Sequence, residues 1–279
     1  MALTAEQVKG KIKSLAKKNE ADARALMRIY MMERFLERVA VSQYACNFII
    51  KGGILVTSMV GIAMRTTMDI DTSIRNFNLS EDDARRIVEE ISSINLDDGI
   101  QFHIKEVSRI MDEMEYPGIR IAMDAVMGMM TTPIKIDIST GDIITPRAIE
   151  YSYQLMLEKR SINLWSYNLE TILAEKLQTV LVRGVLNTRM RDFYDIRMLL
   201  AGYADQIEPQ VLRKAFHATC EKRSSLQLED QGMEIIAAIA EDDILKGLWI
   251  SYQRKFAYAA NITYSDVIDG VTRLYGMLK

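Results

Sequence analysis

The feature that most constrains this chain is a pair of adjacent glycines at the junction of two unlike segments. Residues 46–50 are mostly apolar and predict a strand. Lys51, Gly52 and Gly53 follow, and residues 55–64 predict a helix. Glycine permits a tight turn, and the first backbone N–H groups of a helix attract anions. We therefore expect a strand, a turn and a helix, with Lys51, Gly52 and Gly53 placed to bind a phosphate group.

Two carboxylates follow this helix. Residues 65–71 are RTTMDID, and residues 67–74 predict a strand. Residues two apart on a strand face the same way, so Asp69 and Asp71 would lie on one surface with Ile70 turned into the core. Hard oxygen ligands of this kind suit Mg²⁺. Acidic residues also occur on solvent-facing strands for solubility, so the pair alone does not define a metal site.

A third acid lies in a later strand. Asp137 alternates with isoleucines in the string KIDI, residues 135–138, which predicts that its side chain points away from the core. Together, Asp69, Asp71 and Asp137 would allow two-metal chemistry, in which one ion activates a hydroxyl and the other stabilises a leaving phosphate. The sequence therefore predicts a Mg²⁺ site, with Mn²⁺ as the alternative ion, beside a triphosphate.

Composition removes several other classes of protein. With His103 and His217 as its two histidines, the chain is not expected to hold a Ser-His-Asp triad or a zinc site. Cys46 and Cys220 are too few for a disulfide framework, which favours the cytoplasm. The formal charge of -3 argues against indiscriminate nucleic-acid binding. No apolar run is long enough to predict a membrane span.

The pattern of the chain changes near its middle. Extended segments with alternating or β-branched residues occur at residues 45–50, 67–74, 101–110, 119–127 and 134–139. After Pro146, successive amphipathic segments predict helices. We expect an α+β fold in which residues 1–145 form a mixed-sheet core with N-terminal helices. Residues 146–279 would form a helical domain that completes the active-site cleft.

Five blocks resemble, in order, the AbiEii/AbiGii-like toxin family of minimal nucleotidyltransferases within the polymerase-beta-like superfamily. They are FIIKGG (48–53), RTTMDID (65–71), KIDI (135–138), NLETILAEK (168–176) and NTRMRDFYDI (187–196). The resemblance implies a nucleotidyltransferase core followed by a helical domain, in the toxin of a toxin–antitoxin or abortive-infection pair. Some members are reported to add nucleotides to the 3′ end of tRNA, which halts translation.

The resemblance also assigns charged residues in the two helical blocks. Family members place the lysine that matches Lys176 at the nucleotide, where its ammonium neutralises phosphate charge. The remaining candidates are Arg65, Arg189 and Arg191 as phosphate-binding residues, and Asp192 or Asp195 as a base or orienting carboxylate. Two simpler interpretations stay open, namely that Arg65 pairs with an aspartate and that Arg191 and Asp195, four apart, form a surface pair.

One position departs from the family pattern. Relatives often carry a hydroxyl residue directly after the glycines, whereas this chain has Ile54, so a hydroxyl contact to phosphate is missing there. Thr57 and Ser58 are the nearest hydroxyl residues and could replace it only if the turn permits.

The expected function is that of a cytoplasmic, Mg²⁺-dependent nucleotidyltransferase toxin that moves a nucleotide from an NTP to an RNA acceptor. The acceptor would be the 3′ end of tRNA, and a winged-helix antitoxin protein would be the partner. The alternatives are nucleotidylation of a protein or small molecule, and a non-catalytic NTP-binding protein that sequesters a partner.

Overall fold

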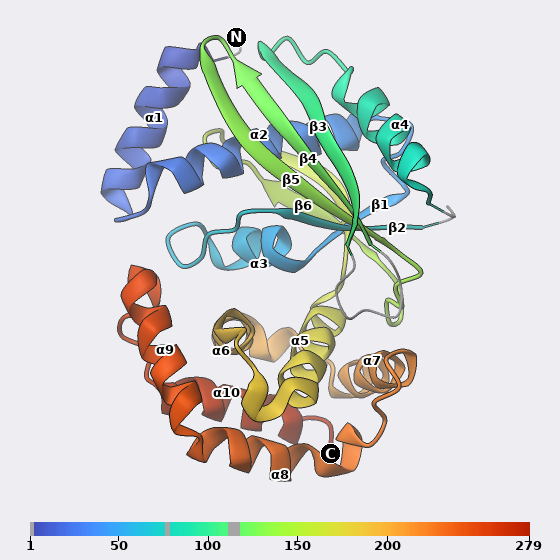
Figure 1. Ribbon diagram of the computed structural model, residues 1–279, viewed down its shortest axis with the longest axis vertical. Coiled ribbons are helices and arrows are strands. Elements are labelled where there is room, and N and C mark those ends of the chain that lie inside the picture. Colours follow the sequence, from blue (N-terminus) through green and yellow to red (C-terminus); the bar gives the residue numbers. More distant parts are fainter. Residues whose placement is uncertain (1–2, 76–78, 111–117) are drawn as a thin grey trace. The chain divides into compact units, whose positions relative to one another are not determined.

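The computed structural model describes residues 3–75, 79–110 and 118–279 (Figure 1). The chain forms two compact units. Unit 1 comprises Met1–Asp142 and Ile149–Ser166, and unit 2 comprises Ile143–Ala148 and Tyr167–Lys279. The chain therefore enters unit 2, returns to unit 1 and enters unit 2 again. Among the described helices, none combines the length and the apolar character that crossing a membrane requires.

The described strands of unit 1 form one seven-stranded mixed sheet with the order β3-β4-β5-β2-β1-β7-β6. The strands are β1 (Phe48–Lys51), β2 (Ile70–Ile74), β3 (Ile100–Ile110), β4 (Gly118–Met127), β5 (Met130–Thr140), β6 (Ile149–Gln154) and β7 (Ser161–Ser166). Pairing is parallel between β2 and β5 and between β1 and β7, and antiparallel elsewhere. The α+β class predicted from the sequence is confirmed.

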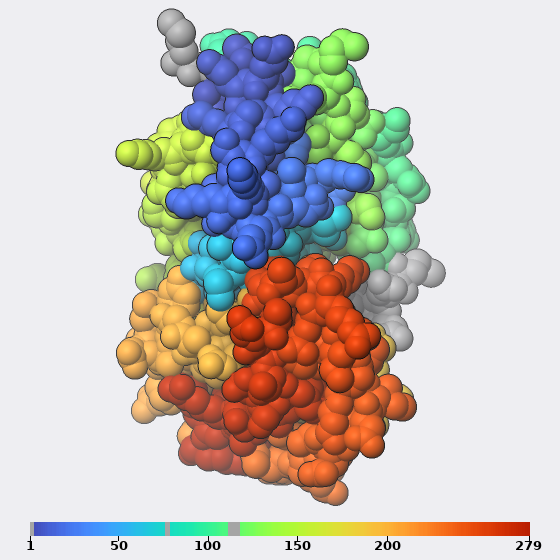
Figure 2. Space-filling model, turned by 90° about the vertical axis from the view of Figure 1, so that its left-hand side faces the viewer, coloured from blue at the N-terminus to red at the C-terminus, as the bar shows by residue number. Residues whose placement is uncertain are grey.

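In the described part of unit 1, four helices accompany the sheet. They are α1 (Ala5–Lys18), α2 (Ala23–Val41), α3 (Gly52–Val60) and α4 (Glu81–Ser92). Figure 2 shows α1, in dark blue, on the outside of this unit. Ser80 begins α4 with a capping box, because its hydroxyl accepts from the backbone of Asp83 while the Asp83 carboxylate accepts from Ser80. The sequence itself signals this helix start, because a serine followed by Glu81, Asp82 and Asp83 is typical of a helix N-terminus.

The period of the central strands decides which face of the sheet carries polar groups. In β5, Ile134, Ile136 and Ile138 are buried, and Asp137 between them is not. β4 alternates in the same way along its length, with every second residue buried. Burying this apolar face against α2, which contacts β5 and β7, leaves the opposite face for charged side chains.

Unit 2 is helical, as the sequence predicted. Its helices are α5 (Leu169–Arg183), α6 (Met190–Tyr203), α7 (Pro209–Lys222), α8 (Leu228–Glu241), α9 (Asp243–Lys255) and α10 (Tyr264–Gly276). Asn168, in the fourth sequence block, caps α5 by accepting from Thr171 N at 2.9 Å and donates to Thr145 O at 2.6 Å. This asparagine therefore fixes the segment Ile143–Ala148 to the start of α5.

The expectation that helices follow Pro146 directly is wrong for residues 149–166. They form β6 and β7, which extend the sheet of unit 1, so a single boundary at residue 145 does not describe the chain. The reason is a period of two: in β7, Ile162 and Leu164 are buried and their neighbours Ser161 and Asn163 are exposed. That alternation was readable in the sequence.

A buried carboxyl group joins α2 to the segment after β6. Glu33 is 2% exposed, and its two oxygens accept from the backbone N–H of Met156 at 3.0 and 3.1 Å. Burial raises the pKa of Glu33 to about 8, against the opposing effects of the Met156 N–H and the Arg34 charge. The folded protein therefore favours the neutral form of this group.

This contact makes stability depend on pH. Because the pKa of Glu33 is raised from 4.5 to about 8, the folded protein holds a proton that the unfolded chain releases between these values. The free energy of unfolding therefore falls as the pH rises through this range. Glu33→Gln keeps an acceptor for Met156 and has no charge to bury. We expect the wild type to lose about 1–3 kcal/mol more than Glu33→Gln between about pH 5 and pH 9 in denaturant titrations.

Glu106→Gln, at an exposed position of β3, is the matched control and should follow the wild-type profile. Parallel profiles for wild type and Glu33→Gln would contradict this account.

Candidate active site

A row of four charged side chains crosses the middle of the sheet in unit 1. In the strand register, Arg120 on β4 lies opposite Asp137 on β5, Asp137 opposite Asp71 on β2, and Asp71 opposite Lys51 on β1. Residues directly opposite on adjacent strands share a face of the sheet. The row therefore places two adjacent carboxylates between two cations. Asp69 lies just before β2 and adds a third carboxylate near its start.

The two glycines bring the start of α3 against Asp71. Gly52 has φ +54°, and a Cβ atom there would lie 2.3 Å from Asp71 Oδ2. A Cβ atom on Gly53 would lie 2.4 Å from Thr67 Oγ1. The N–H of Gly53 donates to Asp71 Oδ2 at 2.8 Å. Only glycine allows this approach, which sets the positive end of the α3 dipole beside the carboxylate.

Arg65 holds this turn from inside. Its side chain is buried, and Nη1 donates to Gly53 O at 2.7 Å and to Thr57 Oγ1 at 2.9 Å. The expectation that Arg65 binds phosphate directly is thus corrected to a positioning role, because a buried guanidinium bonded to the turn does not reach a ligand. Ile54 is fully buried, and Ser58 Oγ is engaged with Leu55 O and Tyr151 Oη. Neither nearby hydroxyl replaces the one missing at Ile54.

Lys51 ends the row on the β1 side. Its Nζ lies 2.7 Å from Ser139 Oγ and 2.6 Å from Asp142 Oδ2. Ser139 Oγ also donates to the backbone O of Thr72 at 3.2 Å. Burial raises the pKa of Asp71, and the Gly53 N–H and then the Lys51 charge oppose this rise, so the ammonium acts on the site electrostatically as well as by hydrogen bonds.

Arg120 ends the row on the β4 side, and sequence reasoning missed it. Its Nε and Nη2 bind Asp137 Oδ1 and Oδ2 at 2.8 and 2.6 Å, a bidentate pair. The one signal in the sequence was an arginine at an outward-facing position of an alternating strand. Its partner depends on which strand lies next to β4, which the sequence alone does not state.

The carboxylates form an environment that favours a bound cation. Burial raises the pKa of both Asp69 and Asp71, and the charge of Asp137 adds to each shift. Oxygen ligands held close together at this cost fit a divalent ion at Asp69 and Asp71. Asp137 faces the same surface, but Arg120 occupies both of its oxygens. Within residues 3–75, 79–110 and 118–279, no group of three histidine, cysteine or acidic side chains is already arranged to hold a metal.

Unit 2 carries a separate charged group near the start of α6. Lys176 Nζ on α5 lies 2.9 Å from Asp192 Oδ1 and 2.7 Å from Asp195 Oδ2. Asp195 is fully buried and Asp192 is 7% exposed. The structure thus brings together the three candidates from the last two sequence blocks. It also excludes the surface-pair interpretation of Asp195.

The arginines of this block are placed differently from one another. Arg189 is exposed, and its Nε lies 3.4 Å from Asp192 Oδ2. The guanidinium carbon of Arg191 lies over the Phe256 ring, 5.5 Å from the ring centroid. Asn187 is buried and accepts from Arg189 N at 2.8 Å, which forms the turn before α6.

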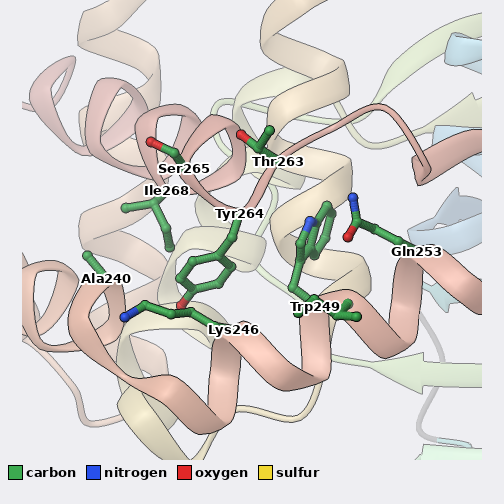
Figure 3. Close-up of a pocket in the computed structure, with 9 residues that line it drawn as sticks. Ala240, Lys246, Trp249, Gln253, Thr263, Tyr264, Ser265 and Ile268 are labelled. Carbon is green, nitrogen blue, oxygen red and sulfur yellow. The ribbon is translucent and has the colours of Figure 1, made fainter.

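A hollow of about 580 Å³ on unit 2 is lined by residues of α8, α9 and α10 and by none of these charged side chains (Figure 3). Three of its polar side chains are already bonded within the chain. Trp249 Nε1 donates to Ile262 O, Tyr264 Oη to Ile239 O, and Lys246 Nζ binds Asp243. The sequence did not single out this hollow. The bonds within the chain account for these side chains as part of the packing of unit 2.

Comparison with known proteins gives one family. The model described as "Nucleotidyl transferase AbiEii toxin, Type IV TA system" matches residues 34–269. Comparison with curated proteins found no match.

Among solved structures, JHP933 from Helicobacter pylori matches with 15% identity and a TM-score of 0.48 over 92% of this chain and 94% of that one. A second H. pylori structure, described provisionally as a nucleotidyltransferase, matches with 15% identity and a TM-score of 0.48 over 92% and 97%. An antigenic nucleotidyltransferase-like protein from Paracoccidioides brasiliensis matches with 15% identity and a TM-score of 0.36 over 81% and 93%.

The glycine turn predicts the effect of one methyl group. Gly52→Ala places a Cβ atom against Asp71 in a left-handed backbone conformation. We expect it to reduce the free energy of unfolding by at least about 1 kcal/mol, as measured by denaturant titration. Gly10→Ala is the matched control, because a Cβ atom on Gly10 in α1 meets nothing within 4 Å. Equal stability of the two variants would contradict the close approach.

Removing the cation of the charged group in unit 2 should cost more stability than Gly52→Ala does. Lys176→Met leaves Asp192 and the fully buried Asp195 without their shared ammonium. We expect the variant to lose about 3–5 kcal/mol of stability in thermal or denaturant unfolding. Lys214→Met, at an exposed position of α7, should stay within about 0.5 kcal/mol of wild type. If both lysine variants lose the same stability, the buried group does not hold unit 2 together.

Proposed function

The chain belongs to the AbiEii nucleotidyl transferase toxin family of type IV toxin–antitoxin systems, and we propose that it moves a nucleotide from an NTP to an RNA acceptor with Mg²⁺ bound at Asp69 and Asp71. The single observation that carries this proposal is the contact between Gly53 N–H and Asp71 Oδ2 at 2.8 Å. It joins a phosphate-attracting helix start to a metal-binding carboxylate, which is the pairing that a metal-bound triphosphate needs.

The position of each residue in and beside the row gives it a separate role in the proposal. Asp71 is oriented by Gly53, and Asp69, one residue before β2, supplies the second carboxylate. A divalent ion, Mg²⁺ or Mn²⁺, supplies charge neutralisation at the triphosphate when it is bound there. Lys51, beside Asp71 in the register, places an ammonium where phosphate charge would gather. Arg65 keeps the turn in the shape that makes these contacts.

The charged group of unit 2 also enters the proposal. The family resemblance assigns the lysine at this place to the nucleotide, and Arg189 is an exposed cation 3.4 Å from Asp192. We propose that Lys176 and its two carboxylates fix the start of α6, so that Arg189 and Arg191 are held in place for phosphate groups. Asp192 is the better placed of the two carboxylates for ligand contact, because Asp195 is fully buried.

For the acceptor we propose the 3′ end of tRNA, so that transfer stops translation in the cytoplasm, in a toxin–antitoxin or abortive-infection setting. This rests on the family resemblance. A toxin of such a system has an antitoxin, for which we propose a winged-helix protein. Transfer to a protein or small molecule, and NTP binding without chemistry, are the alternatives that the experiment separates.

The experiment incubates the purified chain with each α-labelled NTP, Mg²⁺, and either tRNA or a protein extract. We expect label on tRNA, and a loss of at least about 100-fold for Asp69→Asn and for Asp71→Asn, since each removes a metal-binding charge. Asp205→Asn, at an exposed turn of unit 2, is the control and should keep full transfer. Label on protein and not on tRNA would show that the acceptor is a protein instead of tRNA. Labelled tRNA at wild-type level with both site variants would overturn the proposal.

A further inference from the structure

The third carboxylate of the row is tied to a cation of the chain itself. Both oxygens of Asp137 are bound by Arg120, at 2.8 and 2.6 Å. Asp71 differs, because one of its oxygens accepts from Gly53 and no other hydrogen bond to it is found among the described residues. Two carboxylates that lie opposite each other in the register therefore have different surroundings.

A bidentate pair of this kind competes with a metal for the same oxygens. The guanidinium fork matches both oxygens of a carboxylate and keeps its charge at every accessible pH. A divalent ion at Asp137 would have to displace the Arg120 guanidinium, which is held beside Asp137 because the two residues lie opposite each other on adjacent strands. Among the described residues, no guanidinium binds both oxygens of Asp69 or of Asp71.

Arg120 is the member of the pair that solvent can reach more readily. Its side chain is 39% exposed, whereas that of Asp137 is 18% exposed. The cation of the pair is thus the more accessible member.

We propose that Arg120 supplies, as a fixed guanidinium, the positive charge that a second metal ion supplies in two-metal nucleotidyl transfer, and that it contacts the phosphate groups of the NTP. Asp137 is then a positioning residue that orients Arg120, and a single divalent ion binds at Asp69 and Asp71. This rests on the proposed function. It replaces the expectation that Asp137 is a metal ligand.

The test counts metal ions and measures nucleotide affinity without turnover. The probes are Mn²⁺, counted by the loss of its free electron-paramagnetic-resonance signal, and the α,β-methylene analogues of the four NTPs, which cannot transfer a nucleotide. We expect one Mn²⁺ per chain in the analogue complex, both in wild type and in Asp137→Asn.

Arg120→Gln should weaken analogue binding by about 10- to 100-fold without changing this number. Arg120→Lys should recover part of the affinity, since it keeps a charge without the fork. The double variant Arg120→Gln with Asp137→Asn should bind as weakly as Arg120→Gln alone, because Asp137 acts through Arg120. Arg109→Gln is the control and should bind as wild type, because Arg109 is an exposed residue of the neighbouring strand β3 that pairs with Glu81 of α4.

Two bound Mn²⁺ ions in wild type, falling to one in Asp137→Asn, would overturn the proposal. So would analogue affinities of Arg120→Gln and Arg120→Lys equal to that of the Arg109→Gln control. In either case, loss of Mn²⁺ in Asp71→Asn would leave the proposed function standing. If the wild type binds none of the four analogues, both proposals fall.

Discussion

The hydrogen bond from Gly53 N–H to Asp71 Oδ2 is the contact on which the candidate site depends. It can form only because Gly52 and Gly53 lack Cβ atoms. A Cβ atom on Gly52 would collide with Asp71, and one on Gly53 would collide with Thr67. Arg65 fixes the same turn from its buried side. These contacts join the start of α3 to β2 through the Asp71 carboxylate, and the register of the strands on either side then places the charged row.

The charged row of unit 1 contains its own cations. Lys51 and Arg120 stand at the two ends of the row, with Asp71 and Asp137 between them, and Asp69 lies just before β2. Burial raises the pKa of Asp69 and of Asp71, and both groups also feel the repulsion of neighbouring carboxylates. Binding one divalent ion would relieve it. In unit 2, by contrast, one ammonium, that of Lys176, is shared by two buried carboxylates.

Local patterns predicted much of the fold, and distant pairings could not be predicted. Alternation identified the strands that became β1 to β5, and Ser80 identified the start of α4, because both signals lie within a few residues. The strands β6 and β7 were missed although Ile162 and Leu164 alternate, because the helical pattern further along outweighed two short segments.

The candidate site divides in the same way. Asp69, Asp71 and the glycines were predicted from spacing, and the charged residues of unit 2 from the family resemblance. The pairing of Asp137 with Arg120 depends on strand order, and the burial of Arg65 depends on the packing around the turn. Neither feature can be predicted from the residues that are adjacent in the sequence.

Anomalous diffraction at the manganese edge, from crystals soaked with Mn²⁺ and an NTP, tests the central claim most directly. The account predicts a single peak within bonding distance of the carboxylates of Asp69 and Asp71, beside the turn at Gly53. A peak at Asp137 with Arg120 displaced, or no peak near β2, would contradict it.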